Sequence, residues 1–179
     1  MAKLLPIITA PDERLKKIAK PVERVDASIA GLMDDMLYTM YHTHGIGLAA
    51  PQIGRLQRII VVDVAMEDQP SKPYKMVNPV IISRSDEQAT YTEGCLSLPD
   101  QYGDITRPQK ITVQYSDAQN QIQKLEADGL LSICIQHEID HLDGVLFVDR
   151  LSKLRRDMIL RKLRKIKNYE SSDMTSPVL

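Results

Sequence analysis

Residues 128–144 read DGLLSICIQHEIDHLDG, and this stretch predicts the helix around which the rest of the chain is arranged. Asp128 stands at its start as an N-cap, and Gly144 follows its predicted end at His141. Within it, His137 and His141 are four residues apart, and Glu138 directly follows the first histidine, which is the H-E-x-x-H pattern. Four residues at about 100° each place both imidazoles within about 40° on one helix face, separated by about 6 Å of rise. This spacing allows one metal ion to bind both, and Glu138 can then act as a general base on a water molecule there.

The alternative for this stretch is a pair of core-facing histidines with an ordinary surface glutamate between them. Two unpaired imidazoles buried side by side would themselves need an explanation, because buried polar groups are normally hydrogen-bonded. The sequence therefore favours a metal site over a packed histidine pair.

A third protein ligand is harder to find in the sequence. Phe147 occupies the position of the third histidine of metzincins, and the one downstream glutamate, Glu170, lies beyond a highly basic helix. Cys134 shares the helix, but about 10.5 Å of rise separates it from His141, whereas metal bonds are about 2.0–2.3 Å long, so it is expected to be a small packed residue. Cys95, in the stretch EGCLSLP at the end of a predicted strand, is the better candidate. One Cys, two His and one water make an open, catalytic type of site.

Outward from this helix, the patterns predict a single α+β domain over residues 1–179, with a strand-rich middle of antiparallel or mixed sheets packed around the central helix. An amphipathic helix is expected over residues 26–44, capped by Asp26 and ended by Gly45, and a C-terminal helix over about 151–168. GIGLAAPQIG (45–54) is expected as a loop. The predicted strands are 58–64, 75–83, 89–96, 110–117 and 121–127.

The composition is that of an ordinary globular protein, with 179 residues, 43 % hydrophobic and 26 % charged. No apolar run approaches the ~18 residues that span a membrane, and the N-terminus is a poor signal peptide. Two cysteines cannot form a disulfide framework, so a cytoplasmic location is expected.

Charge is distributed unevenly along the chain. Residues 1–150 hold 15 basic and 21 acidic side chains, whereas residues 151–179 hold eight basic and three acidic ones. The basic segment is expected to form a helix with one broad apolar face and Leu160 at its edge. Such a helix can dock on an acidic body, lie on a membrane or bind RNA. The apolar face is expected to contain Leu151, Leu154, Met158, Ile159, Leu163 and Ile166.

GIGLAAPQIG, EGCLSLP and QHEIDHLDG, in this order, resemble the three motifs of the peptide deformylase family, and the resemblance extends over nearly the whole chain. It implies removal of the N-formyl group from the initiator methionine of nascent polypeptides, with release of formate. It also implies an α+β fold and a metal site at Cys95, His137 and His141. The native metal in this family is commonly ferrous iron, Fe2+, although zinc, nickel or cobalt (Zn2+, Ni2+, Co2+) also occupies the site.

The resemblance also implies roles for the surrounding residues. Glu138 takes a proton from the attacking water and passes it to the leaving amine, while the backbone N–H of Leu96 and the side-chain amide of Gln52 meet the oxyanion. The formylated peptide is expected to lie extended beside the glycine loop, with its methionine side chain in a pocket. The residues expected to bind substrate are Gly45, Ile46, Gly47, Gly94, Ile133 and Cys134.

Roles are also expected for a few residues near the predicted metal ligands and the substrate. Gln136 and Asp140 are candidates for orienting the ligand histidines, with a solvated helix face as the alternative. His44 stands near a position where many relatives carry an acidic residue, and Tyr102 where some place an arginine that holds the substrate backbone. Arg107 is expected in a structural ion pair.

Two other functional classes remain open from the residues alone. H-E-x-x-H also suggests a metallopeptidase that cuts internal bonds, but the usual third ligands are missing. The basic C-terminal helix suggests a non-enzymatic RNA- or ribosome-binding module, which would leave the metal ligands without a purpose. In the resembling bacterial enzymes this helix contacts the ribosome near the exit tunnel, so the resemblance implies the ribosome as a partner.

Overall fold

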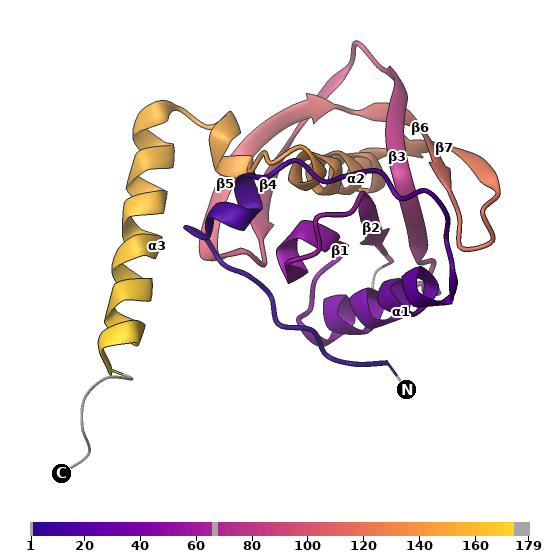
Figure 1. Ribbon diagram of the computed structural model, residues 1–179. Coiled ribbons are helices and arrows are strands. Elements are labelled where there is room, and N and C mark those ends of the chain that lie inside the picture. Colours follow the sequence, from indigo (N-terminus) through magenta and orange to yellow (C-terminus); the bar gives the residue numbers. More distant parts are fainter. Residues whose placement is uncertain (1, 66–67, 174–179) are drawn as a thin grey trace.

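The computed structural model describes residues 2–65 and 68–173, and it is built from two antiparallel sheets, three α-helices and three short 3-10 helices (Figure 1). The five-stranded sheet has the order β1-β2-β3-β6-β7, and β4 and β5 pair as a separate sheet. The strands are β1 (Gly47–Ala49), β2 (Ile59–Val62), β3 (Tyr74–Arg84), β4 (Gln88–Cys95), β5 (Leu98–Pro108), β6 (Lys110–Ser116) and β7 (Ile122–Asp128). The helices are η1 (Glu13–Lys16), α1 (Ala27–His42), η2 (Ala50–Ile53), α2 (Gly129–Leu142), η3 (Phe147–Arg150) and α3 (Lys153–Asp173).

Helix α2 lies in the middle of the molecule, with strands around it (Figure 1). Ile135, Ile139 and Leu142 pack into a core cluster with residues of the five-stranded sheet such as Ile60 and Met76. Polar residues on the same helix are buried as well, including both histidines of the H-E-x-x-H pattern. A helix buried on nearly every side is characteristic of a central element. The predicted α+β fold around this helix is confirmed.

The predicted first helix is also confirmed, and α1 begins as its sequence indicates. The Asp26 carboxylate accepts a hydrogen bond from the backbone N–H of Ile29 at 2.9 Å, an N-cap. The C-terminal end differs from the prediction, because the left-handed residue is His44, with φ of 56°, and not Gly45. Gly45 is needed for space instead, since a Cβ there would lie 2.9 Å from the Leu96 side chain.

Gly31 is an exposed residue inside α1, and a Cβ at this position would meet no atom within 4 Å. We expect Gly31→Ala to stabilise the protein by about 0.5–1 kcal/mol, because alanine loses less backbone entropy in a helix than glycine. Thermal unfolding should show a rise in Tm of about 1–4 °C. Gly144→Ala is the opposing control: it has φ of 72° and a Cβ there would lie 2.4 Å from the Lys16 carbonyl, so Tm should fall.

All five predicted strands are present, but two further strands, β1 and β5, were not predicted. β1 lies inside the expected glycine loop. β5 shows alternating burial, yet its buried positions include Gln101, Gly103 and Arg107, so the alternation is invisible in a hydrophobicity pattern. Asp128 takes the N-cap position of α2, as predicted, but its side chain makes no capping hydrogen bond and lies near Gln109 and Lys110 instead.

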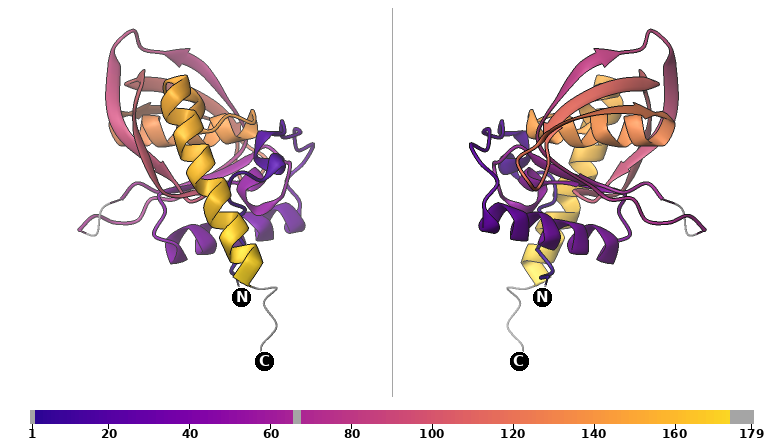
Figure 2. Two further views of the ribbon diagram at one scale, coloured as in Figure 1. Left: turned by 90° about the vertical axis from the view of Figure 1, so that its left-hand side faces the viewer. Right: turned by 90° about the vertical axis from the view of Figure 1, so that its right-hand side faces the viewer.

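Helix α3 lies along one side of the molecule (Figure 1 and Figure 2), and only a few of its side chains are packed into a core cluster. Ile159 and Leu163 are buried, with Leu160 partly buried beside them. Only part of the predicted apolar face is packed against the body, because Leu154, Met158 and Ile166 are exposed. The helix continues to Asp173, beyond the predicted end near 168, and the last six residues lie outside the described part.

Among the described residues, none of the helices combines the length and apolar character needed to cross a bilayer.

Candidate metal centre and active site

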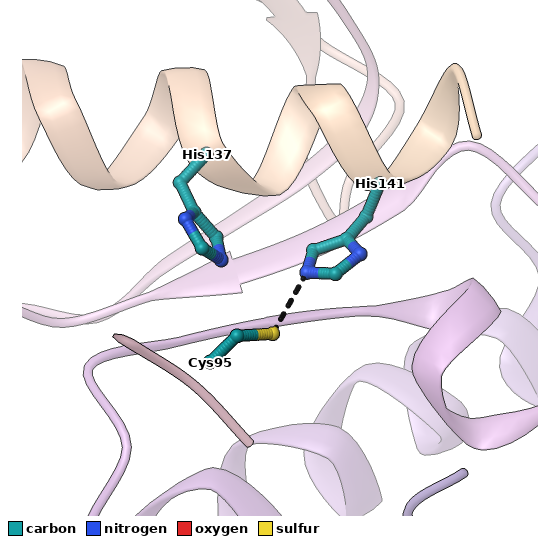
Figure 3. Close-up of side chains that lie close together, drawn as sticks. All are labelled: Cys95, His137 and His141. Carbon is teal, nitrogen blue, oxygen red and sulfur yellow. Dashed lines mark hydrogen bonds between the residues drawn. The ribbon is translucent and has the colours of Figure 1, made fainter. Parts of the chain in front are cut away.

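The structure brings Cys95, His137 and His141 together. Cys95 ends β4, and both imidazoles point from α2 toward it (Figure 3). One ligand atom from each lies within 4.8 Å of the others, and Cys95 Sγ is 3.2 Å from His141 Nε2. A thiolate and two imidazoles suit a divalent transition metal, and three protein ligands leave a fourth position open. The residues present therefore fit the metal that the sequence predicts.

Glu93 fixes the orientation of the first histidine. Its Oε2 lies 2.9 Å from His137 Nδ1, which leaves Nε2 of that ring free to face Cys95. Arg107 in turn donates to both Glu93 oxygens, at 2.6 and 2.9 Å. Burial alone raises the pKa of Glu93, but the hydrogen bonds from Arg107 and His137 outweigh it and lower the pKa to about 2. Glu93 is therefore an anion that accepts a hydrogen bond from the Nδ1–H group of His137, and this hydrogen bond sets the tautomer of the ring.

The sequence interpretation missed Glu93, although a signal was available. It stands two residues before Cys95 in a strand, and residues i and i+2 of a strand face the same side. Whatever places Cys95 toward α2 therefore places Glu93 there too. The expected structural ion pair of Arg107 is confirmed.

The two residues expected to orient the histidines do not contact them. Gln136 Nε2 donates to the Pro108 carbonyl at 2.8 Å, and the Asp140 carboxylate accepts from Arg107 and Arg150. His141 Nδ1 is buried with no hydrogen-bond partner among the described residues. The prediction for Gln136 and Asp140 is thus wrong for direct contact, because their side chains leave α2 on other faces than the histidines.

Glu138 is buried beside the ligands. Its Oε2 has no hydrogen-bond partner in the described part of the chain, and its side chain faces the backbone of β1. Burial, with smaller contributions from the nearby carboxylates, raises the pKa of Glu138 to about 7. A carboxyl group with this pKa can accept and return a proton near neutral pH, as a general base and acid must.

Gln52, in η2, and Leu96, directly after Cys95, lie beside the metal ligands and the cavity next to them. The Gln52 Oε1 accepts a hydrogen bond from the Ala49 backbone N–H at 2.8 Å, which turns Nε2 toward Cys95 Sγ, 3.5 Å away. Because the oxygen end is held by a donor, the NH2 end is fixed as a donor toward the site. The side chain is 1 % exposed, so it is held in place before any ligand arrives. This is the arrangement that an oxyanion-binding group requires.

A cavity of about 500 Å³ opens beside these residues. Its walls come from the chain around β1, the N-terminal half of α2 and both strands of the β4–β5 hairpin. All six residues expected to bind substrate line it, as do His44 and Tyr102. Residues that the sequence interpretation did not select also line it, including Tyr91, Leu130 and Gln101. Tyr91 and Leu130 lie on predicted elements and Gln101 lies on β5, which was not predicted, and nothing in the local sequence marks any of the three.

Cys134 forms part of this cavity and not of the metal site. It is 5 % exposed, and its Sγ lies 3.5 Å from the Ile46 carbonyl. Burial raises the pKa of the Cys134 thiol well above its usual range, so it stays a neutral thiol. A small neutral side chain is suited to an apolar pocket wall.

Comparison with known proteins gives a consistent result. A family model described as polypeptide deformylase matches residues 4–157. A peptide deformylase of Mesorhizobium japonicum is 50 % identical over 161 residues, which are 90 % of this chain and 92 % of that protein. The crystal structure of a peptide deformylase from Ehrlichia chaffeensis is similar with a TM-score of 0.89 and 42 % identity, over 94 % and 99 % of the two chains. A Met-Ala-Ser-bound class I type b enzyme from Acinetobacter baumannii is 36 % identical with a TM-score of 0.79, over 84 % and 100 %.

Proposed function

The chain belongs to the peptide deformylase family, and on that premise we propose that Cys95, His137 and His141 hold its metal ion while Glu138 moves the proton in the reaction. The activity is that of a metal-dependent hydrolase that removes the N-formyl group from the N-terminal methionine of nascent polypeptides and releases formate. This assignment replaces the two alternatives, an internal metallopeptidase and a non-enzymatic RNA-binding module. We also propose that residues 1–179 act as one catalytic domain.

The observation that carries the assignment of roles is the convergence of Cys95, His137 and His141 on one point, with Cys95, His137 and Glu138 lining the cavity beside it. When bound, the metal ion supplies Lewis acidity toward a water molecule and the formyl oxygen. Glu138, whose carboxylate is buried beside these residues, then accepts the proton of the attacking water and returns it to the leaving amine. The Gln52 amide and the Leu96 backbone N–H donate to the oxygen of the formyl group as negative charge develops there.

The peptide part of the substrate is proposed to lie along the cavity between β1 and the β4–β5 hairpin. Gly45, Ile46 and Gly47 offer backbone groups to an extended chain on one side, and Gly94 does so on the other. Ile133 and Cys134 form apolar wall where a methionine side chain fits. The Met-Ala-Ser complex of the Acinetobacter baumannii relative supports a tripeptide of this chemistry as ligand.

The test of the function is formate release from formyl-Met-Ala-Ser by protein purified without oxygen. We expect formate and free Met-Ala-Ser in equal amounts, and no cleavage between methionine and alanine. Cleavage of internal peptide bonds, or no formate from metal-loaded protein, would overturn the proposal. We propose Fe2+ as the native ion, because a thiolate and two imidazoles suit it and the family commonly uses it. Metal analysis of the anaerobic preparation tests this separately, and an excess of Zn2+, Ni2+ or Co2+ would contradict it.

Gly47 provides a prediction for the site. A Cβ at this position would lie 2.4 Å from Glu138 Oε1 and 2.8 Å from Cys134 Sγ. We expect Gly47→Ala to lower kcat/KM for formyl-Met-Ala-Ser about 10- to 100-fold, because it displaces the carboxylate that moves the proton. Gly31→Ala is the matched control, because a Cβ at that position would meet no atom within 4 Å, and kcat/KM of the two variants is compared by steady-state kinetics. Equal kcat/KM for both variants would contradict the close approach of β1 to α2.

We further propose that the protein acts in the cytoplasm and associates with the ribosome through α3. Arg161, Lys162 and Lys165 are exposed on this helix, close to the exposed side chains of Leu154 and Met158. A cationic surface of this kind binds phosphate backbones in a salt-dependent manner. Replacing the three basic residues together by glutamine should weaken salt-sensitive co-sedimentation with ribosomes, while formate release from the tripeptide stays unchanged. Unchanged co-sedimentation would exclude α3 as the docking element.

A further inference from the structure

A chain of alternating charges leads from the metal site to the base of the C-terminal helix. His137 Nδ1 lies 2.9 Å from Glu93, and Glu93 accepts from Arg107 through two hydrogen bonds. Arg107 Nη1 also donates to Asp140 Oδ2 at 2.8 Å. Asp140 in turn accepts from Arg150 at 2.7 and 2.6 Å, so that each of its oxygens has an arginine donor. Arg150 is the last residue of η3, which connects α2 to α3.

Other contacts place the same segment against the site. The Phe147 ring, at the start of η3, stacks on the His137 imidazole with centroids 6.3 Å apart and an interplanar angle of 23°. Leu151 packs so closely on β5 that a Cβ on Gly103 would lie 2.9 Å from it. The segment therefore reaches His137 by two routes, one apolar and one ionic.

The balance of charge among Glu93, Arg107 and Asp140 depends on Arg150. Arg107 is 2 % exposed and faces two carboxylates, Glu93 and Asp140. Arg150 gives Asp140 a second, bidentate partner, which makes the four groups neutral as a set. Without Arg150, Arg107 would be the only cation paired with Asp140. Asp140 would then attract Arg107 more strongly, away from Glu93. Since Glu93 holds His137, the change would reach the ring that faces Cys95.

We propose that Arg150 is a positioning residue for the metal site: by pairing with Asp140 it keeps Arg107 on Glu93 and His137 in its ligand orientation. This inference rests on the proposed metal ligation. It assigns a role in metal retention to a residue that touches neither substrate nor metal ligand. It also gives a reason why the segment between α2 and α3 is held to α2 by the ion pair of Arg150 with Asp140, in addition to the contacts of Phe147 and Leu151.

The test uses Co2+ as the probe metal in the full chain, because its visible absorption bands report thiolate and imidazole ligation. The rate at which EDTA removes Co2+ is measured for wild type, Arg150→Gln, Arg150→Lys and Arg156→Gln, with Tm and tripeptide kinetics beside it. Arg156 is the matched control. It is 37 % exposed against 43 % for Arg150, and its ion pairs go to Asp149 and Asp157, outside the chain of charges.

We expect Arg150→Gln to release Co2+ about 3- to 10-fold faster and to lower kcat by a similar factor, with KM unchanged. Direct outer partners of a ligand histidine have effects of about 10- to 100-fold, and Arg150 acts less directly, through Asp140, Arg107 and Glu93. Arg150→Lys keeps the charge without the fork and should lie between Arg150→Gln and wild type. Arg156→Gln should match wild type.

A double-mutant cycle adds a second criterion. If Arg150 acts through Asp140, combining Arg150→Gln with Asp140→Asn should release Co2+ no faster than Asp140→Asn alone. Additive effects would overturn the inference. So would Arg150→Gln with a lowered Tm but a wild-type release rate, since that is the signature of a structural role. Failure of the wild type to bind Co2+ at all would overturn the proposed metal site, and the inference with it.

Discussion

Glu138→Gln is expected to lower kcat for formate release by about 10³-fold, because general acid–base catalysis by one positioned group contributes about 10²- to 10⁴-fold. The glutamine keeps the size of the side chain and its place against Gly47, but it cannot accept the proton of the attacking water. Glu138 is not one of the three proposed ligands, so the metal content should stay the same. The measurement is kcat and KM for formyl-Met-Ala-Ser together with metal analysis of both proteins.

A second carboxylate near α2 provides the control for Glu138→Gln. Asp143 lies just past α2, about half exposed, and pairs with Arg58. Asp143→Asn removes a carboxylate near the site without reaching the cavity, and its kinetics should match the wild type. A metal-loaded Glu138→Gln protein that retains a tenth or more of the wild-type kcat would contradict the proton-transfer role of Glu138.

Arg107→Met is expected to destabilise the protein by about 3–5 kcal/mol at pH 7, because it leaves Glu93 as a buried anion without its cation. Equilibrium unfolding in urea, with EDTA in every sample, measures the change without a contribution from metal binding. Lys110→Gln is the control: Lys110 pairs with Asp128 at 3.6 Å with both side chains 58 % exposed, and it should change stability by less than about 1 kcal/mol.

The pH dependence of this effect has a definite sign. In the wild type the pKa of Glu93 is lowered from 4.5 to about 2, so its stabilising contribution is present above about pH 4.5 and is lost as the pH falls toward 2. Without Arg107, burial raises the pKa of Glu93, and the side chain takes up a proton as the pH falls. The difference in stability between wild type and Arg107→Met should therefore be smaller at pH 4 than at pH 7. A difference that grows toward low pH would contradict this assignment of the buried charge.

The parts of the fold that depend on local interactions could be predicted from the sequence. Helices α1 and α2 both have apolar periodicity, and α1 has a capping aspartate at its start. These signals lie within or next to each helix, so the bounds of both helices were predicted to within a few residues. The ligand set also followed from local spacing, since two histidines one turn apart need a third ligand and Cys95 was the better candidate. The structure brings these three residues together.

What could not be predicted depends on pairing between distant segments. β5 is buried at Gln101 and Arg107, which read as loop residues until β4 lies beside them. The role of Glu93 requires Arg107 from the paired strand and His137 from the helix, and neither is its sequence neighbour. Which residues of the apolar face of α3 are packed and which are exposed depends on the segments that meet the helix, and not on the helix itself.

The placement of the site residues along the chain has a consequence for folding. Gln52 and Cys95 are 43 residues apart, and Cys95 and His141 a further 46, yet their side chains meet around one point. Two long loops must close before this arrangement exists, and each closure carries an entropic cost that only the finished core offsets. No fragment that lacks Gln52, Cys95 or the histidines of α2 should thus retain a weak activity. During unfolding, the loss of catalysis should coincide with the loss of the folded population, so that turnover itself serves as a cooperative reporter of the native state.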